Sequence, residues 1–310
     1  MRILLTGGSG MVGRNLLEHT TAADFEFLKP SSRDLNLLDQ HAVAVYIKKY
    51  KPDFVIHSAA KVGGIQANKL NPYGFLFDNA QIALNVINSC RKEGVDKLIN
   101  ISSANIYPDM TGALNESMVL GGKLNASTEA YALAKAIATK LCQYISETDA
   151  RNNYISLIPC NLYGRHDKFD IANSHMIPSV IRKIHEAHEA GSPSVEIWGD
   201  GEARREFMYA EDLAACIFMV IDKMLSGSSL PNLMNVGIGI DYTINEYYQT
   251  VAKVLGYKGE FVHNLDKPVG MRQKLIDSSR IHALGWQAGT SLQQGIEKTY
   301  QYFLKEVNHG

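Results

Sequence analysis

The 310-residue sequence has few cysteines, no long apolar run and almost no excess of either charge. Its cysteines, Cys90, Cys142, Cys160 and Cys216, are too widely spaced for a metal site and too few for a disulfide framework in a chain of this length. We therefore expect reduced, buried thiols and no metal centre. No apolar stretch reaches the roughly 18 residues that a membrane span requires, and the apolar run that ends at Gly7 is too short for a signal peptide. These absences predict a cytoplasmic protein with no membrane partner.

The balance of charges also argues against a nucleic-acid partner. The formal net charge is −1, with 45% hydrophobic and 20% charged residues, as in ordinary globular proteins. A chain of this length is typical of about two domains of about 150 residues each. An enzyme with one lobe for a cofactor and one for a substrate fits that length.

Short apolar segments alternate with longer helical patterns through the first half of the chain. The predicted strands are residues 3–6, 25–28, 54–57, 98–102 and 154–158. The predicted helices are residues 40–49, 73–92 and 129–147. This alternation predicts βαβ units, and hence an α/β fold with a doubly wound parallel (Rossmann) sheet.

The pattern becomes irregular after Gly164. The elements predicted beyond it are a helix near 177–190, a strand and helix over 205–224 and a strand at 233–236, and the remainder, including 291–306, completes the second lobe. We interpret them as two interleaved lobes. The first lobe comprises residues 1–164 and about 205–240, and the second, smaller α/β lobe comprises about 165–204 and 241–310.

A glycine-rich segment follows the first predicted strand and opens a helix. It contains Gly7, Gly10, Met11, Val12 and Gly13. Small residues let the backbone approach a pyrophosphate, whose charge then lies on free N–H groups at a helix N-terminus. A tight turn alone also requires glycine, but the position directly after an N-terminal strand favours dinucleotide binding. We therefore predict that the first lobe binds a dinucleotide through these residues.

The end of the second predicted strand discriminates between cofactors. NAD sites usually place a carboxylate on the ribose 2′-hydroxyl, whereas NADP sites place a cation near the 2′-phosphate. The segment 28–33 contains no carboxylate and ends in Arg33. It predicts NADP(H), with Arg33 bound to the 2′-phosphate. The alternative is that Arg33 pairs with Asp34 or Asp39 on the surface.

Three residues form a predicted catalytic set. Tyr131 and Lys135 lie one helical turn apart on a common face. A nearby cation favours the phenolate, so the pair can transfer a proton to a carbonyl oxygen whose carbon receives a hydride. Ser103 follows the fourth predicted strand, where its hydroxyl can stabilise the developing alkoxide. Lys135 is also predicted to contact the cofactor ribose.

With these residues assembled, the chain resembles the extended short-chain dehydrogenase/reductases and, more narrowly, the GDP-L-fucose synthases. The segments that carry this resemblance beyond the glycine loop are residues 59–65, 161–164, 173–178 and 205–207. The most specific is 59–65, which reads Ala-Ala-Lys-Val-Gly-Gly-Ile. The resemblance implies reduction of the C4 ketone of a GDP-linked 4-keto sugar.

The resemblance also implies the substrate site and the assembly. The implied substrate-binding residues are Asn161, His175, Lys183, Trp198, Arg205 and Lys274. Of these, Trp198, Arg205 and Lys274 match positions where the family holds the nucleotide diphosphate. Related enzymes pair the helices equivalent to 73–92 and 129–147, which implies a homodimer.

One residue departs from the family pattern. GDP-L-fucose synthases epimerise the two carbons beside the ketone before reducing it, and the resemblance assigns that proton chemistry to a cysteine and a histidine. The histidine matches His175, but Asn105 stands at the cysteine position. An amide has no basic site near neutral pH, and Cys160 is the cysteine considered as a replacement. The sequence thus predicts reduction without 3,5-epimerisation, with Ser103, Tyr131, Lys135 and His175 as the catalytic residues.

Four alternatives stay open at this point. The chain could be a bifunctional GDP-L-fucose synthase, or an NAD-dependent sugar-nucleotide 4-epimerase, against which Arg33 counts. A 4,6-dehydratase needs an acid and a base beside the catalytic serine, and Ala104 and Asn105 supply neither. A dinucleotide-sensing regulatory protein would have no use for Ser103, Tyr131 and Lys135.

Overall fold

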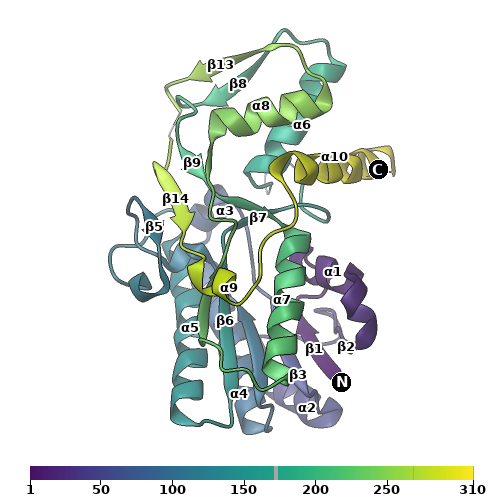
Figure 1. Cartoon of the computed structure of the whole chain (residues 1–310), viewed down its shortest axis with the longest axis vertical. Helices are drawn as coiled ribbons and strands as arrows, with labels where there is room; N and C mark the ends of the chain where they lie inside the picture. The colour runs from purple at the N-terminus through teal and green to yellow at the C-terminus, as the bar shows by residue number, and fades with distance from the viewer. Residues whose placement is uncertain (171–173, 268, 310) are drawn as a thin grey trace.

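The computed structural model describes residues 1–170, 174–267 and 269–309. Figure 1 shows a central sheet with its covering helices at one end of the molecule. A smaller group of helices and strands lies at the other end, and short strands connect the two. The site described below lies where these parts meet.

The central sheet has six parallel strands in the spatial order β11-β6-β4-β3-β1-β2. The strands are β1 (Arg2–Thr6), β2 (Glu26–Leu28), β3 (Phe54–His57), β4 (Lys97–Ile101), β6 (Asn153–Pro159) and β11 (Leu233–Val236). The chain runs from β1 to the edge strand β2 and then returns to β3 on the other side of β1. Ligands of such sheets bind beyond the carboxyl ends of the strands at this switch point. The predicted α/β Rossmann class is confirmed.

Both faces of the sheet are buried, because alternate residues of each strand face opposite sides. Leu4, Val55 and Leu98 belong to the core formed with α2 (Gln40–Tyr50), α4 (Pro72–Lys92) and α5 (Glu129–Thr148). Their neighbours Leu5 and Ile56 belong to the core that contains residues of α1 (Met11–Glu18) and α7 (Ala210–Leu225). All four cysteines are buried and free, as predicted.

The second group of elements has its own core. It contains α6 (Met176–Glu189), α8 (Ile244–Leu255), α10 (Leu292–His309) and the parallel pair β8 (Ser194–Trp198) and β13 (Glu260–Asn264). Ile181 of α6 and Val251 of α8 are fully buried there. Two small sheets lie next to it, one with the order β12-β9-β14-β5 and the other formed by β7 and β10.

The remaining elements are short. The strands are β5 (Ala113–Leu114), β7 (Asn161–Tyr163), β9 (Arg204–Arg205), β10 (Phe207–Tyr209), β12 (Tyr242–Thr243) and β14 (Gln273–Ile276). The helices are α3 (Ile65–Leu70), α9 (Ser279–Ala283) and the 3-10 turns η1 (Thr20–Asp24), η2 (Ala104–Ile106) and η3 (Glu116–Met118). Among the described residues, none of the helices combines the length and the apolarity that a membrane crossing requires. The predicted location in the cell stays a prediction.

The predicted strands of the central sheet match the observed ones to within one residue at each end. Helix α8 was missed, although its sequence carries both end signals. Thr243 and Glu246 form a reciprocal capping box at its start, and Gly256 ends it in the left-handed conformation. The predicted lobe boundaries stay a prediction. Ile281 and Trp286, from the range predicted for the second lobe, pack in a core of the central sheet.

Candidate active site

A cleft of about 1220 Å³ lies beyond the carboxyl ends of the central strands and extends to the second group of elements. Every predicted site residue except Arg33 lines it. These are Gly7, Gly10, Met11, Val12, Gly13, Ser103, Tyr131, Lys135, Asn161, His175, Lys183, Trp198, Arg205 and Lys274. The fold therefore brings together residues from both ends of the sequence at one site.

The glycine loop is shaped by close approach of backbone to backbone. Gly7 has φ +76°, and a Cβ there would lie 2.7 Å from the Ala59 nitrogen. A Cβ at Gly13 would lie 2.3 Å from the Gly7 carbonyl oxygen. Gly10 precedes α1 without a side-chain cap, so the first N–H groups of the helix are free to bind an anion. The loop therefore fits the pyrophosphate of a dinucleotide.

Arg33 is exposed and is not among the residues that line the cleft. The alternative, a surface ion pair of Arg33 with Asp34 or Asp39, is also not observed within the described residues. Asp34 accepts hydrogen bonds from Ser31, and Asp39 caps α2 through the Ala42 N–H. Among the described contacts, no ion pair joins Arg33 to either carboxylate. Its contact with a 2′-phosphate stays a prediction.

Lys135 and Tyr131 face the cleft from α5. The Lys135 ammonium is buried, donates a hydrogen bond to the Ile101 carbonyl at 2.8 Å and lies 5.9 Å from the centre of the Tyr131 ring. Burial lowers the pKa of Lys135 to about 8. Burial raises the pKa of Tyr131, and a hydrogen bond with Ser103 partly offsets that rise. The phenol is therefore protonated at neutral pH and can act as a proton donor.

Ser103 occupies the turn between β4 and η2, directly beside this pair. Its hydroxyl accepts a hydrogen bond from the Asn105 N–H at 3.2 Å, which closes the turn. Because β4 is a buried central strand, the turn is fixed at the floor of the cleft. Ser103 and Tyr131 can thus both reach one carbonyl oxygen.

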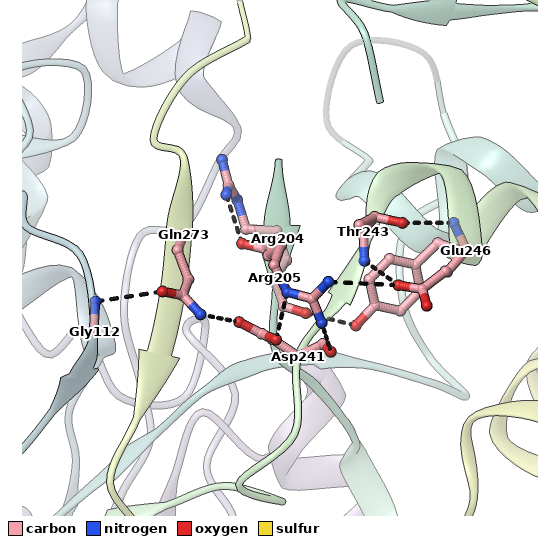
Figure 2. A network of polar contacts seen from close by, with 8 residues as sticks. Gly112, Arg204, Arg205, Asp241, Thr243, Glu246 and Gln273 are labelled. Carbon is pink, nitrogen blue, oxygen red and sulfur yellow. Dashed lines mark hydrogen bonds and ion pairs between the residues drawn. The ribbon is translucent and has the colours of Figure 1, made fainter. Parts of the chain in front are cut away.

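Two cations enter the cleft side by side from the sheet β12-β9-β14-β5. Arg205 of β9 is the register partner of Lys274 of β14, and Arg204 is the partner of Gln273. Because side chains alternate along a strand, Arg204 and Gln273 share one face and Arg205 and Lys274 the other. Figure 2 shows Arg204 and Gln273 bound to Asp241, at 2.8 and 2.6 Å, while the Arg205 side chain points away from that network.

Both of these cations lie in surroundings that disfavour charge. Desolvation, followed by the Arg205 charge, lowers the pKa of Lys274 to about 8. Desolvation also lowers the pKa of Arg205. The Lys274 ammonium donates a hydrogen bond to the Asn105 side-chain oxygen. Two adjacent, partly buried cations form a site that an anion would stabilise.

Three other predicted substrate residues also line the cleft. Trp198 is 58% exposed, donates its indole N–H to Glu196 at 2.9 Å and has the Lys267 ammonium 5.4 Å from its ring centre. Lys183 donates a hydrogen bond to the Glu196 carbonyl. Asn161 donates its side-chain N–H to the Glu206 carbonyl at 3.0 Å.

His175 precedes α6 and lines the cleft. Desolvation and then the Lys168 charge lower its pKa, so it is neutral near pH 7. Asn173, part of a segment that carries the family resemblance, lies outside the described residues. Cys160 also lines the cleft but is buried, and burial, followed by Glu206, raises the pKa of its thiol well above the ordinary value.

Lys61 lies in the segment 59–65 and is a structural residue of the site that was not predicted from the sequence. The Lys61 N–H donates to the buried side chain of Asn79 at 2.7 Å, and its ammonium pairs with Asp78 at 2.8 Å. These contacts hold the wall of the cleft after β3. A buried asparagine on an otherwise apolar helix face is the signal that could have indicated this bond.

Comparison with known proteins identifies the family. The sequence pattern of the NAD dependent epimerase/dehydratase family matches residues 3–237. The chain belongs to this family. It is 52% identical to the GDP-L-colitose synthase of Yersinia pseudotuberculosis over the whole of both chains. It is 47% identical to the GDP-L-fucose synthase of Azorhizobium caulinodans, over 98% of this chain and 96% of that one.

The fold comparison agrees with this assignment. A GDP-mannoheptose C4 reductase from Campylobacter jejuni, solved with NADP bound, superimposes with a TM-score of 0.88 at 29% identity, over 98% of both chains. The resemblance to the extended short-chain dehydrogenase/reductases and to the GDP-L-fucose synthases is confirmed. The protein is an oxidoreductase of this epimerase/dehydratase family.

Proposed function

We propose that this protein reduces the C4 ketone of a GDP-linked 4-keto sugar with NADPH and does not epimerise C3 or C5. The reduction is supported by the convergence of Ser103, Tyr131 and Lys135 on one cleft beside the glycine loop. The observation that carries the second part is Asn105, whose amide lies in the cleft two residues after Ser103. The names of the relatives described above all refer to GDP-linked sugars. The cofactor is NADP(H).

The residues act on the carbonyl oxygen. When bound, NADPH supplies the hydride that reduces the ketone carbon. Tyr131 transfers its phenolic proton to the oxygen as the C–O double bond becomes single, and Ser103 donates a hydrogen bond to the same oxygen. The Lys135 ammonium then stabilises the phenolate that remains, until a proton from solvent restores the phenol.

Epimerisation would require a base for a carbon-bound proton beside the ketone. Asn105 has no basic site, and its side-chain oxygen already accepts a hydrogen bond from Lys274. The raised pKa of Cys160 keeps that thiol protonated, so it is a poor base. Lys274, with its pKa lowered to about 8, is mostly an ammonium at pH 7. His175 would serve to position substrate hydroxyls.

The substrate nucleotide would lie between the two ends of the molecule. Arg205 and Lys274 would bind the diphosphate, and the exposed face of Trp198 would stack on a planar group. Asn161, His175 and Lys183 would contact the sugar and its phosphates. The experiment below identifies the sugar, which is a hexose or a heptose.

A panel of GDP-linked 4-keto sugars tests the proposal. Each would be incubated with the protein and NADPH, loss of absorbance at the reduced-nicotinamide band would be followed, and the product would be identified by NMR. We expect turnover of at least one GDP-linked ketone and little with the UDP-linked counterpart. Turnover with UDP-linked sugars alone, or the absence of NADPH oxidation with every ketone, would contradict the proposal.

A homodimer through α4 and α5 is part of this proposal. Both helices carry exposed apolar side chains at a spacing that places them on one face, namely Tyr73, Phe77 and Leu84 on α4 and Leu133, Ile137 and Tyr144 on α5. Tyr73 is 73% exposed and stacks on Phe77, with ring centres 5.4 Å apart. Light scattering should give twice the chain mass for the wild type and the monomer mass for Ile137→Glu.

A further inference from the structure

Asn105 is placed between the catalytic turn and the cationic side of the cleft. Its N–H donates to the Ser103 hydroxyl at 3.2 Å, and its side-chain oxygen accepts a hydrogen bond from Lys274, which comes from β14. We propose that Asn105 is a positioning residue that holds the Lys274 ammonium where it binds the diphosphate of the substrate. This inference rests on the proposed function, because it takes a GDP-linked sugar as the ligand.

The Lys274 ammonium needs a hydrogen-bond acceptor. Arg205 lies beside Lys274 in register, and two adjacent cations repel. A partly buried ammonium that lacks a hydrogen-bond acceptor is unfavourable. Among the described contacts, the Asn105 oxygen is the one hydrogen-bond acceptor of this ammonium. Asn105 therefore keeps Lys274 in the cleft in the absence of substrate.

The groups around this pair oppose the charge of Lys274 overall. Cys160 and Asp109 attract the Lys274 charge more weakly than desolvation and Arg205 oppose it. Cys160 itself is held neutral by burial. In the part of the chain that the structure describes, Lys274 has no ion-pair partner, so the hydrogen bond to the amide is the contact that holds its ammonium. A dianionic diphosphate would provide the missing negative charge when it binds.

An amide suits this position better than a carboxylate or a thiol. A neutral oxygen holds the ammonium and leaves its charge available to an anionic ligand, whereas a carboxylate would neutralise it. A thiol at this position is a weak acceptor and would hold the ammonium poorly. Asn105 thus has a role of its own, beyond the loss of a base.

A double-mutant cycle with GDP as the probe tests this role. Calorimetry on the full chain, saturated with NADP+, measures the Kd for GDP without any turnover. Because a hydrogen bond to a charged group is lost, we expect Asn105→Ala to raise this Kd about 10-fold. In a Lys274→Met background the same change should alter it by less than about twofold, since the coupled partner is already absent.

Control variants separate positioning from folding. Asn115→Ala changes an asparagine of the same segment that lies outside the cleft, and it should leave the Kd for GDP unchanged. Each variant should keep the wild-type affinity for NADP+, which shows that the site next to the glycine loop is intact. Asn105→Asp keeps a hydrogen-bond acceptor, but its negative charge offsets the positive charge of the Lys274 ammonium, so it should also weaken GDP binding.

The possible outcomes distinguish failure of the role proposed for Asn105 from failure of the proposed function. An unchanged Kd in Asn105→Ala, or the same increase in both backgrounds, would overturn the role of Asn105 and leave the proposed function intact. A wild-type protein that binds NADP+ but not GDP would overturn the proposed function, and this role with it.

Discussion

The Lys135 ammonium lies 5.9 Å from the centre of the Tyr131 ring and is anchored on the Ile101 carbonyl, one turn along α5 from the phenol. Ile101 ends β4, the strand that leads to Ser103. A single strand thus fixes both Lys135, which we propose stabilises the phenolate, and Ser103, which we propose contacts the substrate oxygen. The catalytic geometry follows from how α5 packs on this strand.

Tyr131→Phe should retain cofactor binding and lose most turnover. The change removes the proton donor but keeps the ring that packs on the cleft wall, and general acid catalysis is typically worth about 10²–10⁴-fold. Steady-state rates with a reactive keto sugar and a fluorescence titration of NADPH would measure both effects. A variant with turnover within about threefold of the wild type would show that Tyr131 is not the proton donor.

Lys135→Met should lower turnover and also weaken cofactor binding, because the ammonium is predicted to contact both the phenol and the ribose. The pH dependence gives a second check. Burial lowers the pKa of Lys135 to about 8, so its charge is present below that pH and is lost as the pH rises through it. Wild-type kcat should therefore fall above about pH 8. The same alkaline decrease in Lys135→Met would assign it to another group.

Arg33→Ala should narrow the preference for NADPH over NADH. A charge-assisted hydrogen bond to the 2′-phosphate exists only with NADPH and contributes about 1.5–3 kcal/mol, or roughly 10–100-fold. The loss should appear chiefly in kcat/KM for NADPH, with NADH almost unaffected. Because Arg33 does not line the cleft in the structure, an unchanged ratio would assign the 2′-phosphate to other residues. Ser32 and Asn36 line the cleft there.

GDP binding should weaken as the pH rises through about 8. Desolvation and Arg205 lower the pKa of Lys274 to about 8, so the ammonium that we propose binds the diphosphate is present below that pH and lost above it. In Asn105→Asp the new carboxylate favours the charged lysine, and the decrease in affinity should move to higher pH. Calorimetry from pH 6.5 to about 9.5 would show both effects. A pH-independent Kd would exclude Lys274 from the contact with GDP.

The sequence was sufficient for the parts of the fold that follow local rules. The buried strands 54–57 and 233–236 were predicted without error, because apolar runs between turn signals leave little choice. The glycine loop and the pair Tyr131 and Lys135 were also identifiable, because each is a short-range pattern. Helix α8 carried its own capping box and could have been predicted.

The polar contacts between distant segments could not have been predicted in this way. Asn105 and Lys274 are 169 residues apart, and their bond depends on how β14 lies beside β9. No local periodicity specifies that register, because β9 and β14 are short strands that lie far apart in the sequence. From the sequence alone, the one predicted consequence of Asn105 was therefore the loss of a base for epimerisation.

Deuterium exchange tests whether the protein lacks a base for epimerisation. If no base for epimerisation is present, the enzyme should reduce a GDP-linked 4-keto sugar in D2O without incorporating deuterium at C3 or C5 beyond the spontaneous rate. Epimerisation needs an enolate, which forms by removal of a carbon-bound proton. Asn105 cannot remove that proton, and the desolvation that lowers the pKa of His175 makes its imidazole a weaker base than usual. Mass spectrometry and NMR of the product would measure the incorporation.

Asn105→Cys is the decisive variant in this experiment. It places a thiol beside the Lys274 ammonium, and a neighbouring cation lowers the pKa of a thiol, so a thiolate base becomes available. Exchange in this variant but not in the wild type would assign the missing epimerisation to one side chain. Enzyme-dependent exchange in the wild type, with inverted configuration, would instead contradict the reductase proposal. If Cys160→Ser then abolished that exchange and spared reduction, the buried thiol at the end of β6 would be the base.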